Sequence, residues 1–435
     1  MRYRYSSTEE TSSPHLVVCL PEIVSLILGH LQPSELNKTT YSVLYPSLFV
    51  NKLWHDCASR VLWRELTFED SPTEYDAFLK LTSVLANNPI PLSMSLSAAP
   101  TLIVANPSQC LVTNIPGQNQ QQDQQLNTTK PALSSLFRSM SASVPKNTRL
   151  LRSESRIPKL KQLDTTTIKS SSSAIVLSKE SHNINRAHLE LYRRSIRSLT
   201  LRKIKDKHIN EPLQQWSQNT SQLRRLDFYI CDYVTNDSLY PFIAHKHLTH
   251  LSLAGCHRIT DKAISQAAKY CPQLEHLDLR ACGQVSDSSI AVVAWYCRGL
   301  KHLNVGRVRD REKITIKSIG EIAKYTQVSV LGLAGCDIAD DCMIKLAHHR
   351  KGGLERVSVN NCHRITNKTV RTYVQYCPNL SVFEMKECHW VDDWASVAAL
   401  VERKVLLTLC DQQNRACTDW ARRRGKVLDV RAPAK

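Results

Sequence analysis

Cysteine and histidine are the residues of this chain best suited to metal binding or nucleophilic chemistry, and their spacing argues against both roles. Among the 15 cysteines and 16 histidines, no two cysteines follow the CxxC spacing that supplies ligand pairs in zinc ribbons and RING domains. The glycine motifs of phosphate loops and nucleophile elbows are missing as well, as is HExxH. We therefore expect no metal, no cofactor and no catalytic residue.

The cysteines instead recur at fixed places in a repeated pattern. Six lie eight residues after the start of a repeat, and three more lie at the end of its helical part. Positions spread along a chain in this way do not converge on one point, so we expect small buried thiols that pack in a core. The first group is Cys231, Cys256, Cys282, Cys336, Cys362 and Cys388, and the second is Cys271, Cys297 and Cys377.

Arginine supplies the most specific binding chemistry. The segment GRVRDREK begins at Gly306 and contains Arg307, Arg309 and Arg311. Guanidinium groups donate paired hydrogen bonds that match a carboxylate or a phosphate. The segment lies in the one repeat with Val308 where a cysteine is expected. It predicts a site for an acidic or phosphorylated target, with an ordinary solvated basic loop as the alternative.

The elements that position these residues form a repeat. Copies begin at positions 196, 223, 248, 274, 300, 328, 354 and 380, with the shared frame LxxLxLxxCxxITDxxIxxxAxxCxx. In the copy that begins at Leu248, Leu251 and Leu253 alternate with neighbours that point the other way, as in a half-buried strand. Asp261 is then expected to cap a helix whose apolar face begins at Ile264.

Stacked copies of this unit predict an α/β solenoid over residues 196–410, with parallel strands inside and helices outside. The frame resembles the cysteine-containing leucine-rich repeats. Residues 411–435 depart from it and are expected to form a C-terminal cap and basic tail.

The outward strand positions would form a continuous concave surface, because neighbouring parallel strands lie about 4.8 Å apart. Concave faces of solenoids commonly bind partners. Three histidines would stack in one column there. A metal site or pH switch is conceivable, but we favour ordinary polar surface residues. With the basic loop included, the predicted target-binding residues are Arg225, Tyr229, His250, His276, Arg280, His302, Asn304, Arg307, Arg309, Arg311, Arg356, Asn360 and Lys386.

Residues 15–70 form an apolar module that begins LPEIVSLILGHLQPSEL and ends VNKLWHDCASRVLWRELTF. It resembles the F-box, a small all-α module. The resemblance implies docking on a Skp-type adaptor, and through it on a cullin-RING ubiquitin ligase. The alternative is a helical piece that only caps the repeats. The expected adaptor-binding residues are Leu20, Pro21, Ile23, Ile27, Leu28, Leu31, Val50, Trp54 and Trp63.

Several stretches of the repeats resemble the fungal antagonist of mitotic exit network family, whose members are F-box/leucine-rich-repeat proteins of late mitosis. The resemblance implies targets among regulators of mitotic exit and cell separation. These stretches are DFYICDYVTNDSLYPFIA, LAGCHRITD, LDLRACGQVSD, HLNVGRVR and YTQVSVLGLAGCDIADD.

The remaining segments are polar. Residues 1–14 are expected to be a disordered tail. Residues 71–195 are rich in Pro, Gln and Ser and carry much of the net charge of +18. We expect this basic linker to be largely disordered, because its apolar content is too low to offset the entropy of ordering.

The positive charge favours acidic partners. Nucleic acid is a weak candidate, because no aromatic residues alternate with the basic ones and no DNA-binding motif follows. The start of the chain lacks a signal-peptide layout, and the apolar stretch from Leu16 to Leu31 is shorter than the roughly 20 residues of a membrane span. We expect a cytoplasmic or nuclear protein with no membrane partner.

The combination predicts the substrate-recognition subunit of an SCF ubiquitin ligase, a non-catalytic protein that acts by proximity. The alternative is a leucine-rich-repeat scaffold that inhibits a signalling partner, such as a small GTPase, by occupancy and without ubiquitin transfer.

Overall fold

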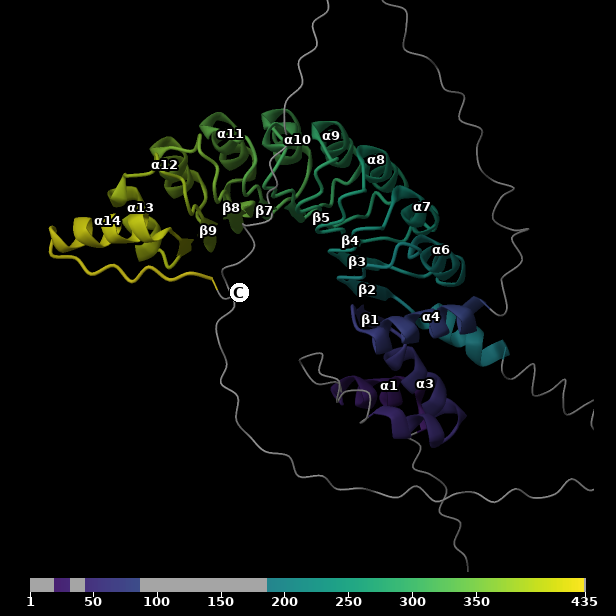
Figure 1. Cartoon of the computed structure of the whole chain (residues 1–435). Helices are drawn as coiled ribbons and strands as arrows, with labels where there is room; N and C mark the ends of the chain where they lie inside the picture. The colour runs from purple at the N-terminus through teal and green to yellow at the C-terminus, as the bar shows by residue number, and fades with distance from the viewer. Residues whose placement is uncertain (1–18, 32–43, 87–185, 434–435) are drawn as a thin grey trace, which may run out of the picture. The chain divides into compact units, whose positions relative to one another are not determined.

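The computed structural model describes residues 19–31, 44–86 and 186–433 (Figure 1). The tail predicted at 1–14 and most of the linker predicted at 71–195 lie outside these ranges.

One parallel sheet organises the described residues. Its ten strands follow the order of the sequence, each hydrogen-bonded to the next. Parallel neighbours need a connection that crosses back over the sheet, and helices supply it. The strands are β1 (Glu65–Glu69), β2 (Ser198–Arg202), β3 (Arg225–Tyr229), β4 (His250–Ser252), β5 (His276–Asp278), β6 (His302–Asn304), β7 (Val330–Gly332), β8 (Arg356–Ser358), β9 (Val382–Glu384) and β10 (Leu406–Thr408).

The helices of the repeats follow one another along the outer side of the sheet (Figure 1). This arrangement confirms the predicted leucine-rich-repeat type of solenoid. The helices are α6 (Asn210–Asn219), α7 (Asn236–Ala244), α8 (Asp261–Tyr270), α9 (Asp287–Tyr296), α10 (Ile316–Tyr325), α11 (Asp340–Arg350), α12 (Asn367–Tyr376) and α13 (Trp394–Glu402), with short 3-10 segments η4 (Arg311–Lys313) and η5 (Lys351–Gly353).

The strand register sorts side chains between the two faces. Leu251 pairs with Leu226 on one side and Leu277 on the other, and all three are buried under the helices. One position earlier, His250 pairs with His276, and both are only half-buried on the opposite face. The alternation predicted from the frame is therefore confirmed, and it aligns one outward side chain per repeat.

The frame cysteines form a ladder through the core. Each thiol after a strand donates to a backbone carbonyl of the preceding repeat. Cys282 Sγ, for example, lies 3.1 Å from Leu253 O, and Cys362 Sγ lies 3.3 Å from Leu333 O. These thiols are buried and free, as expected for packing residues.

A second ladder joins the start of most repeat helices to the next repeat. Thr260, not Asp261, is the N-cap of α8, because its side chain accepts from Lys262 N at 3.3 Å. Asp261 instead accepts from the N–H and the hydroxyl of Ser286 in the next repeat, at 2.8 and 2.6 Å. The predicted cap was wrong by one residue, because this carboxylate connects repeats.

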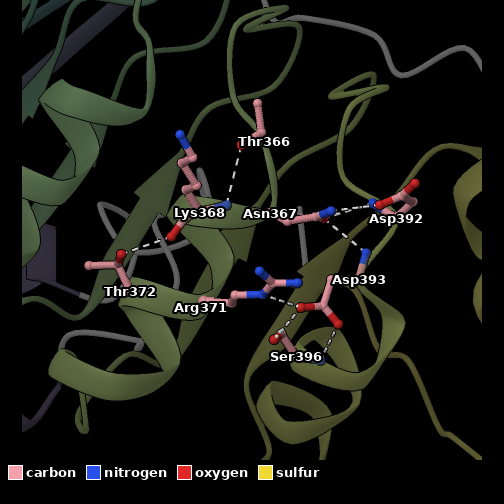
Figure 2. A network of polar contacts seen from close by, with 8 residues as sticks. All are labelled: Thr366, Asn367, Lys368, Arg371, Thr372, Asp392, Asp393 and Ser396. Atoms are coloured by element: carbon pink, nitrogen blue, oxygen red, sulfur yellow. Dashed lines mark hydrogen bonds and ion pairs between the residues drawn. The ribbon is translucent and has the colours of Figure 1, made fainter.

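Figure 2 shows the same ladder between α12 and α13. Asn367 Oδ1 accepts from the N–H groups of Asp392 and Asp393, both at 2.9 Å. Arg371 forms an ion pair with Asp393 at 2.6 Å, and Asp393 in turn caps α13 by accepting from Ser396. Asparagine and aspartate thus fill the same position, and each holds one helix against the next.

The stack extends beyond the boundaries expected at residues 70 and 196. β1 pairs in parallel with β2 along its whole length. Phe78 of α4 (Pro72–Ala86) is buried and stacks on Trp216, with 5.8 Å between ring centroids. A further helix covers 186–195. Residues 65–86 thus add a strand and helix to the sheet, although their sequence lacks the frame cysteine and was assigned to the all-α module and the linker.

The N-terminal helices form a module with its own small core. They are α1 (Pro21–His30), the 3-10 helix η2 (Tyr45–Phe49) and α3 (Lys52–Leu62). Val24 and Leu28 of α1 cluster with Cys57 and Ala58 of α3, apart from the core of the repeats.

At the other end of the described sheet, α14 (Asp411–Arg422) buries Cys417 and Ala421. Beyond it, the carbonyl of Arg431 accepts from Leu407 N at 2.8 Å. The segment expected as a cap therefore lies against β10.

Candidate functional site

A groove of about 1160 Å³ follows the strand side of the sheet. We call it the strand groove. Its walls are built mainly from the outward positions of successive strands, so each repeat contributes a few side chains. The predicted target residues that line it are Arg225, Tyr229, His250, His276, Arg280, His302, Asn304, Arg307, Arg356 and Asn360. Arg309, Arg311 and Lys386 lie outside its lining.

Three histidines form the predicted column in this groove. The ring centroids of His250 and His276 lie 5.6 Å apart, and those of His276 and His302 lie 4.0 Å apart. Burial is the main cause that lowers the pKa of each, to about 4 for His276, and nearby positive charge adds to it. The column therefore presents neutral, stacked rings at neutral pH, which suit contact with an apolar or aromatic side chain.

Two groove arginines already have carboxylate partners. Arg280 contacts both oxygens of Asp278 at 2.7 to 3.0 Å, and this bond raises the pKa of Arg280. Arg356 forms an ion pair with one oxygen of Glu384. Arg225 forms no ion pair with any described residue. An acidic ligand would therefore meet least competition at the β3 end of the groove.

Two glycines make room for the Asn304 side chain in the middle of the groove. A Cβ on Gly332 would lie 2.5 Å from the Asn304 side-chain oxygen, and one on Gly306 would lie 3.2 Å from it. The same oxygen accepts from Gly306 N at 3.1 Å. The middle of the groove therefore presents the half-buried Asn304 amide, held in place against these two glycines.

Arg307 stands one residue before the position of the missing cysteine and is buried, whereas a solvent-facing residue was expected there. It is buried and donates to three backbone carbonyls at 3.2 to 3.3 Å, among them that of Val285. Burial raises the pKa of the neighbouring Cys336 thiol to about 12, and the charge of Arg307 opposes that rise. Val308, which the frame places in the core, is 86% exposed.

The other cations of the basic loop are divided. Arg311 donates to backbone carbonyls of Gly335, at 2.8 Å, and of Asn361. Lys313 donates to a carbonyl as well. Arg309 is exposed and makes no hydrogen bond or ion pair with a described residue. Most cations of the loop therefore hold backbone carbonyls of neighbouring repeats.

The predicted adaptor residues also divide into two groups. On and beside α1, Ile23, Ile27 and Leu31 follow one another by four residues and so share one face. The exposed members of the set are Leu20, Pro21, Leu31 and Val50, and the half-buried ones are Ile23, Ile27 and Trp54.

Two members of the set are used elsewhere. Leu28 is fully buried in the core of the module. Trp63 packs against the core of the repeats and stacks on Tyr192, with 4.8 Å between ring centroids. The spacing of apolar residues in the sequence does not distinguish core residues from adaptor-facing residues here, because buried and exposed positions are neighbours on a short helix.

Three arginines that are absent from the predicted site lie side by side at the start of the sheet. Arg64, Arg197 and Arg224 each stand one residue before a strand, β1, β2 and β3. The signal was a basic residue at one frame position in consecutive repeats. It was hidden because the copy that contains Arg64 lacks the frame cysteine.

Two findings concern other chemistry. Within residues 19–31, 44–86 and 186–433, no group of three or more His, Cys, Asp or Glu side chains is placed to hold a metal ion. In the same part of the chain, no helix is long and apolar enough to cross a bilayer.

Curated relatives match part of the chain, and they share one name, antagonist of mitotic exit network protein 1. The protein of Eremothecium gossypii is 33% identical over 220 residues, which is 49% of this chain and 55% of the relative. That of Yarrowia lipolytica is 40% identical over 175 residues, 40% of this chain and 24% of the relative. That of Candida glabrata is 36% identical over 174 residues, which is 40% of this chain and 34% of the relative. The chain thus spans about a quarter to about a half of these relatives.

Among solved structures, the crystal structure of the Rad7 and Elc1 complex in yeast covers 54% of this chain and 72% of its own, at 12% identity and a TM-score of 0.34. No protein-family model matches the chain.

Proposed function

Because up to half of this chain is homologous to the antagonist of mitotic exit network proteins, we propose that it is the substrate-recognition subunit of an SCF ubiquitin ligase that acts on a regulator of mitotic exit or cell separation. The N-terminal module holds the Skp-type adaptor, and the strand groove holds the target. A separate conjugating enzyme delivers ubiquitin, so this chain contributes proximity and no catalytic group.

The observation that carries the proposal is the apolar surface of the N-terminal module. Phe49 is 71% exposed and Val50 is 59% exposed, and Leu20, Leu26 and Leu31 are exposed as well. The module buries few residues in its own core. So many exposed apolar side chains on a small module favour an interaction site, and a helical module of this size gains stability when a partner covers them.

The strand groove supports the second half of the proposal. It combines stacked neutral histidines, the Asn304 amide at its centre and, at Arg225, a cation without an ion pair among the described residues. These features suit an extended target segment with a flat side chain in the middle and a negative charge toward the β3 end.

Co-purification with a Skp-type adaptor tests the proposal. The full chain is co-expressed with the adaptor and compared with Leu31→Asp/Val50→Asp, which places charge on exposed positions of the module. Val308→Asp is the matched control, because that valine is exposed on the repeats. We expect the wild type and the control to form a complex, and the double variant to bind at least about tenfold more weakly.

Thermal melts followed by circular dichroism verify that all three proteins are folded. A folded wild-type chain that forms no complex with the adaptor contradicts the ligase assignment and favours the scaffold that acts by occupancy. Equal binding by the double variant contradicts the assigned surface.

A further inference from the structure

A second cavity, of about 980 Å³, lies between the end of α3, the helix at 186–195 and the first repeats. We call it the arginine pocket. Its lining includes two carboxylates, Glu65 and Glu190, and a larger set of guanidinium groups. The arginines are Arg60, Arg64, Arg194, Arg197, Arg224 and Arg225.

The strand register forces three of these charges together. Arg64 O accepts from Arg197 N at 2.9 Å, and Arg197 O accepts from Arg224 N at 2.8 Å. Their backbones therefore occupy the same level of three adjacent strands, which lie about 4.8 Å apart. Arg60, in the last turn of α3, lines the cavity beside them.

Most of this positive charge is not neutralised within the fold. Arg194 pairs with Glu190 at 2.6 Å. Arg60, Arg64, Arg224 and Arg225 form no ion pair with any described residue. Arg197 is held by hydrogen bonds from its Nη1 to the carbonyls of Arg194 and Ile196.

The electrostatics agree with this geometry. Burial lowers the pKa of Arg197, and the positive charges of Arg224 and Arg64 lower it further. Like charges held in a partly desolvated cavity repel one another, and a bound anion relieves that repulsion.

We propose that the arginine pocket binds the phosphate group of a phosphorylated serine or threonine in a protein segment that lies along the strand groove. Guanidinium forks match phosphate oxygens in paired hydrogen bonds, and phosphoserine carries nearly two negative charges at neutral pH. Arg225 and His250 line both the pocket and the groove, so one extended segment can occupy both. That this segment belongs to a ligase target rests on the proposed function, whereas phosphate binding itself does not.

The lining favours a peptide over nucleic acid. It contains no Phe, Tyr or Trp on which a base could stack. Its arginines gather in one cavity, and Leu191 and Ala187 add apolar surface for a neighbouring side chain. The test therefore has to distinguish binding of a phosphopeptide from binding of nucleic acid.

The test uses the full chain without adaptor and a fluorescein-labelled phosphoserine peptide with Gly and Ala flanks. Fluorescence anisotropy compares this probe with its unphosphorylated twin and with a labelled single-stranded DNA of similar length. The variant is Arg64→Gln/Arg224→Gln. The control is Arg415→Gln/Arg423→Gln, which removes the same charge from exposed arginines of α14 and its end.

We expect the phosphopeptide to bind at least about tenfold more tightly than its twin. The pocket variant should lose about 10- to 100-fold in affinity, because charge-assisted hydrogen bonds are lost, and the control should stay within about twofold. Equal binding of both peptides, or an unchanged pocket variant, overturns the proposal. DNA binding that is at least as tight and is lost in the pocket variant overturns it in favour of nucleic acid.

Adaptor co-purification of the same variants separates this inference from the proposed function. If the wild-type chain binds the adaptor but does not bind the phosphopeptide more tightly than its twin, only the phosphate-binding proposal is contradicted. Phosphate binding by a chain that forms no adaptor complex contradicts the ligase assignment alone.

Discussion

At the residue scale, the position of one left-handed turn determines that Arg307 of the basic loop is buried. In most repeats, the residue just before the frame cysteine is left-handed, as at Ile230, Ala281 and Asn361, with φ of 52, 59 and 60°. Arg307 holds that position in its repeat, but the left-handed residue there is Asp310, with φ of 52°. The extra residues of the repeat move the turn along the chain, and Arg307 enters the core. Its burial could not be read from the sequence, because arginine is rarely found inside.

Replacing Arg307 should therefore reduce stability. Arg307→Met removes three hydrogen bonds to backbone carbonyls. The carbonyls of Val305 and Asp310 keep a second donor, Cys336 Sγ and Lys313 N, but that of Val285 loses its donor, so we expect the free energy of unfolding to fall by about 1–3 kcal/mol. Arg309→Met is the matched control two residues away. It removes the same charge from an exposed position and should change stability by less than about 0.5 kcal/mol.

Urea unfolding followed by circular dichroism measures both variants. Equal stability of the two would show that Arg307 is not held inside the fold as described. If Arg307→Met keeps its stability and loses target binding, the original prediction of a binding arginine is restored.

At the element scale, the Asp or Asn that begins most of the repeat helices sets how one repeat stacks on the next; α10 and α13 begin instead with Ile316 and Trp394. Asp287 of α9 accepts from Thr315 N at 2.9 Å, from Thr315 Oγ1 at 2.6 Å and from Ser318 Oγ at 2.5 Å. Ser318 is fully buried, so its hydroxyl has no water to replace a lost acceptor. The Asp of the repeat frame thus connects one repeat to the next, and Asn fills the same position in other repeats, as at Asn367.

Asp287→Ala should destabilise the stack by about 2–4 kcal/mol, because it leaves buried donors without an acceptor. Asp287→Asn keeps one acceptor oxygen and should cost about 1 kcal/mol or less. Ser288→Ala, at the exposed neighbouring position, should be neutral within about 0.5 kcal/mol. Denaturant midpoints rank the three variants. An Asp287→Ala variant as stable as Asp287→Asn would contradict the role of Asp287 in connecting the two repeats.

The same scale shows what a sequence can predict. The elements from 196 onward were foreseen because each copy repeats the same alternation and the same helical face, and the outward histidine column followed from the register. β1 and α4 were not foreseen, because their copy lacks the frame cysteine and a long segment separates it from β2. The arginine pocket was missed for the same reason, since it needs Arg64 at the start of β1 beside Arg197.

At the scale of the whole molecule, the thiol ladder couples stability to pH. Burial raises the pKa of Cys282, Cys336 and Cys388 to about 12, and of Cys231 and Cys362 to about 11. In the unfolded chain these thiols ionise near pH 8.5. Between these values the folded protein binds more protons than the unfolded one, so the free energy of unfolding falls as pH rises.

This stabilisation should be fully present below about pH 8.5 and be lost progressively up to about pH 12. Each thiol contributes at most about 1.4 kcal/mol per pH unit in this window. Urea unfolding in the presence of a reductant, at pH 7.5, 9 and 10, measures the slope. Cys282→Ala/Cys336→Ala should show a shallower slope than the wild type, and Cys19→Ala, which changes an exposed cysteine, should show the wild-type slope. Lysine and tyrosine titrate alike in all three proteins, so the difference between slopes isolates the ladder, and three equal slopes would mean that these thiols ionise as readily in the folded protein as in the unfolded chain.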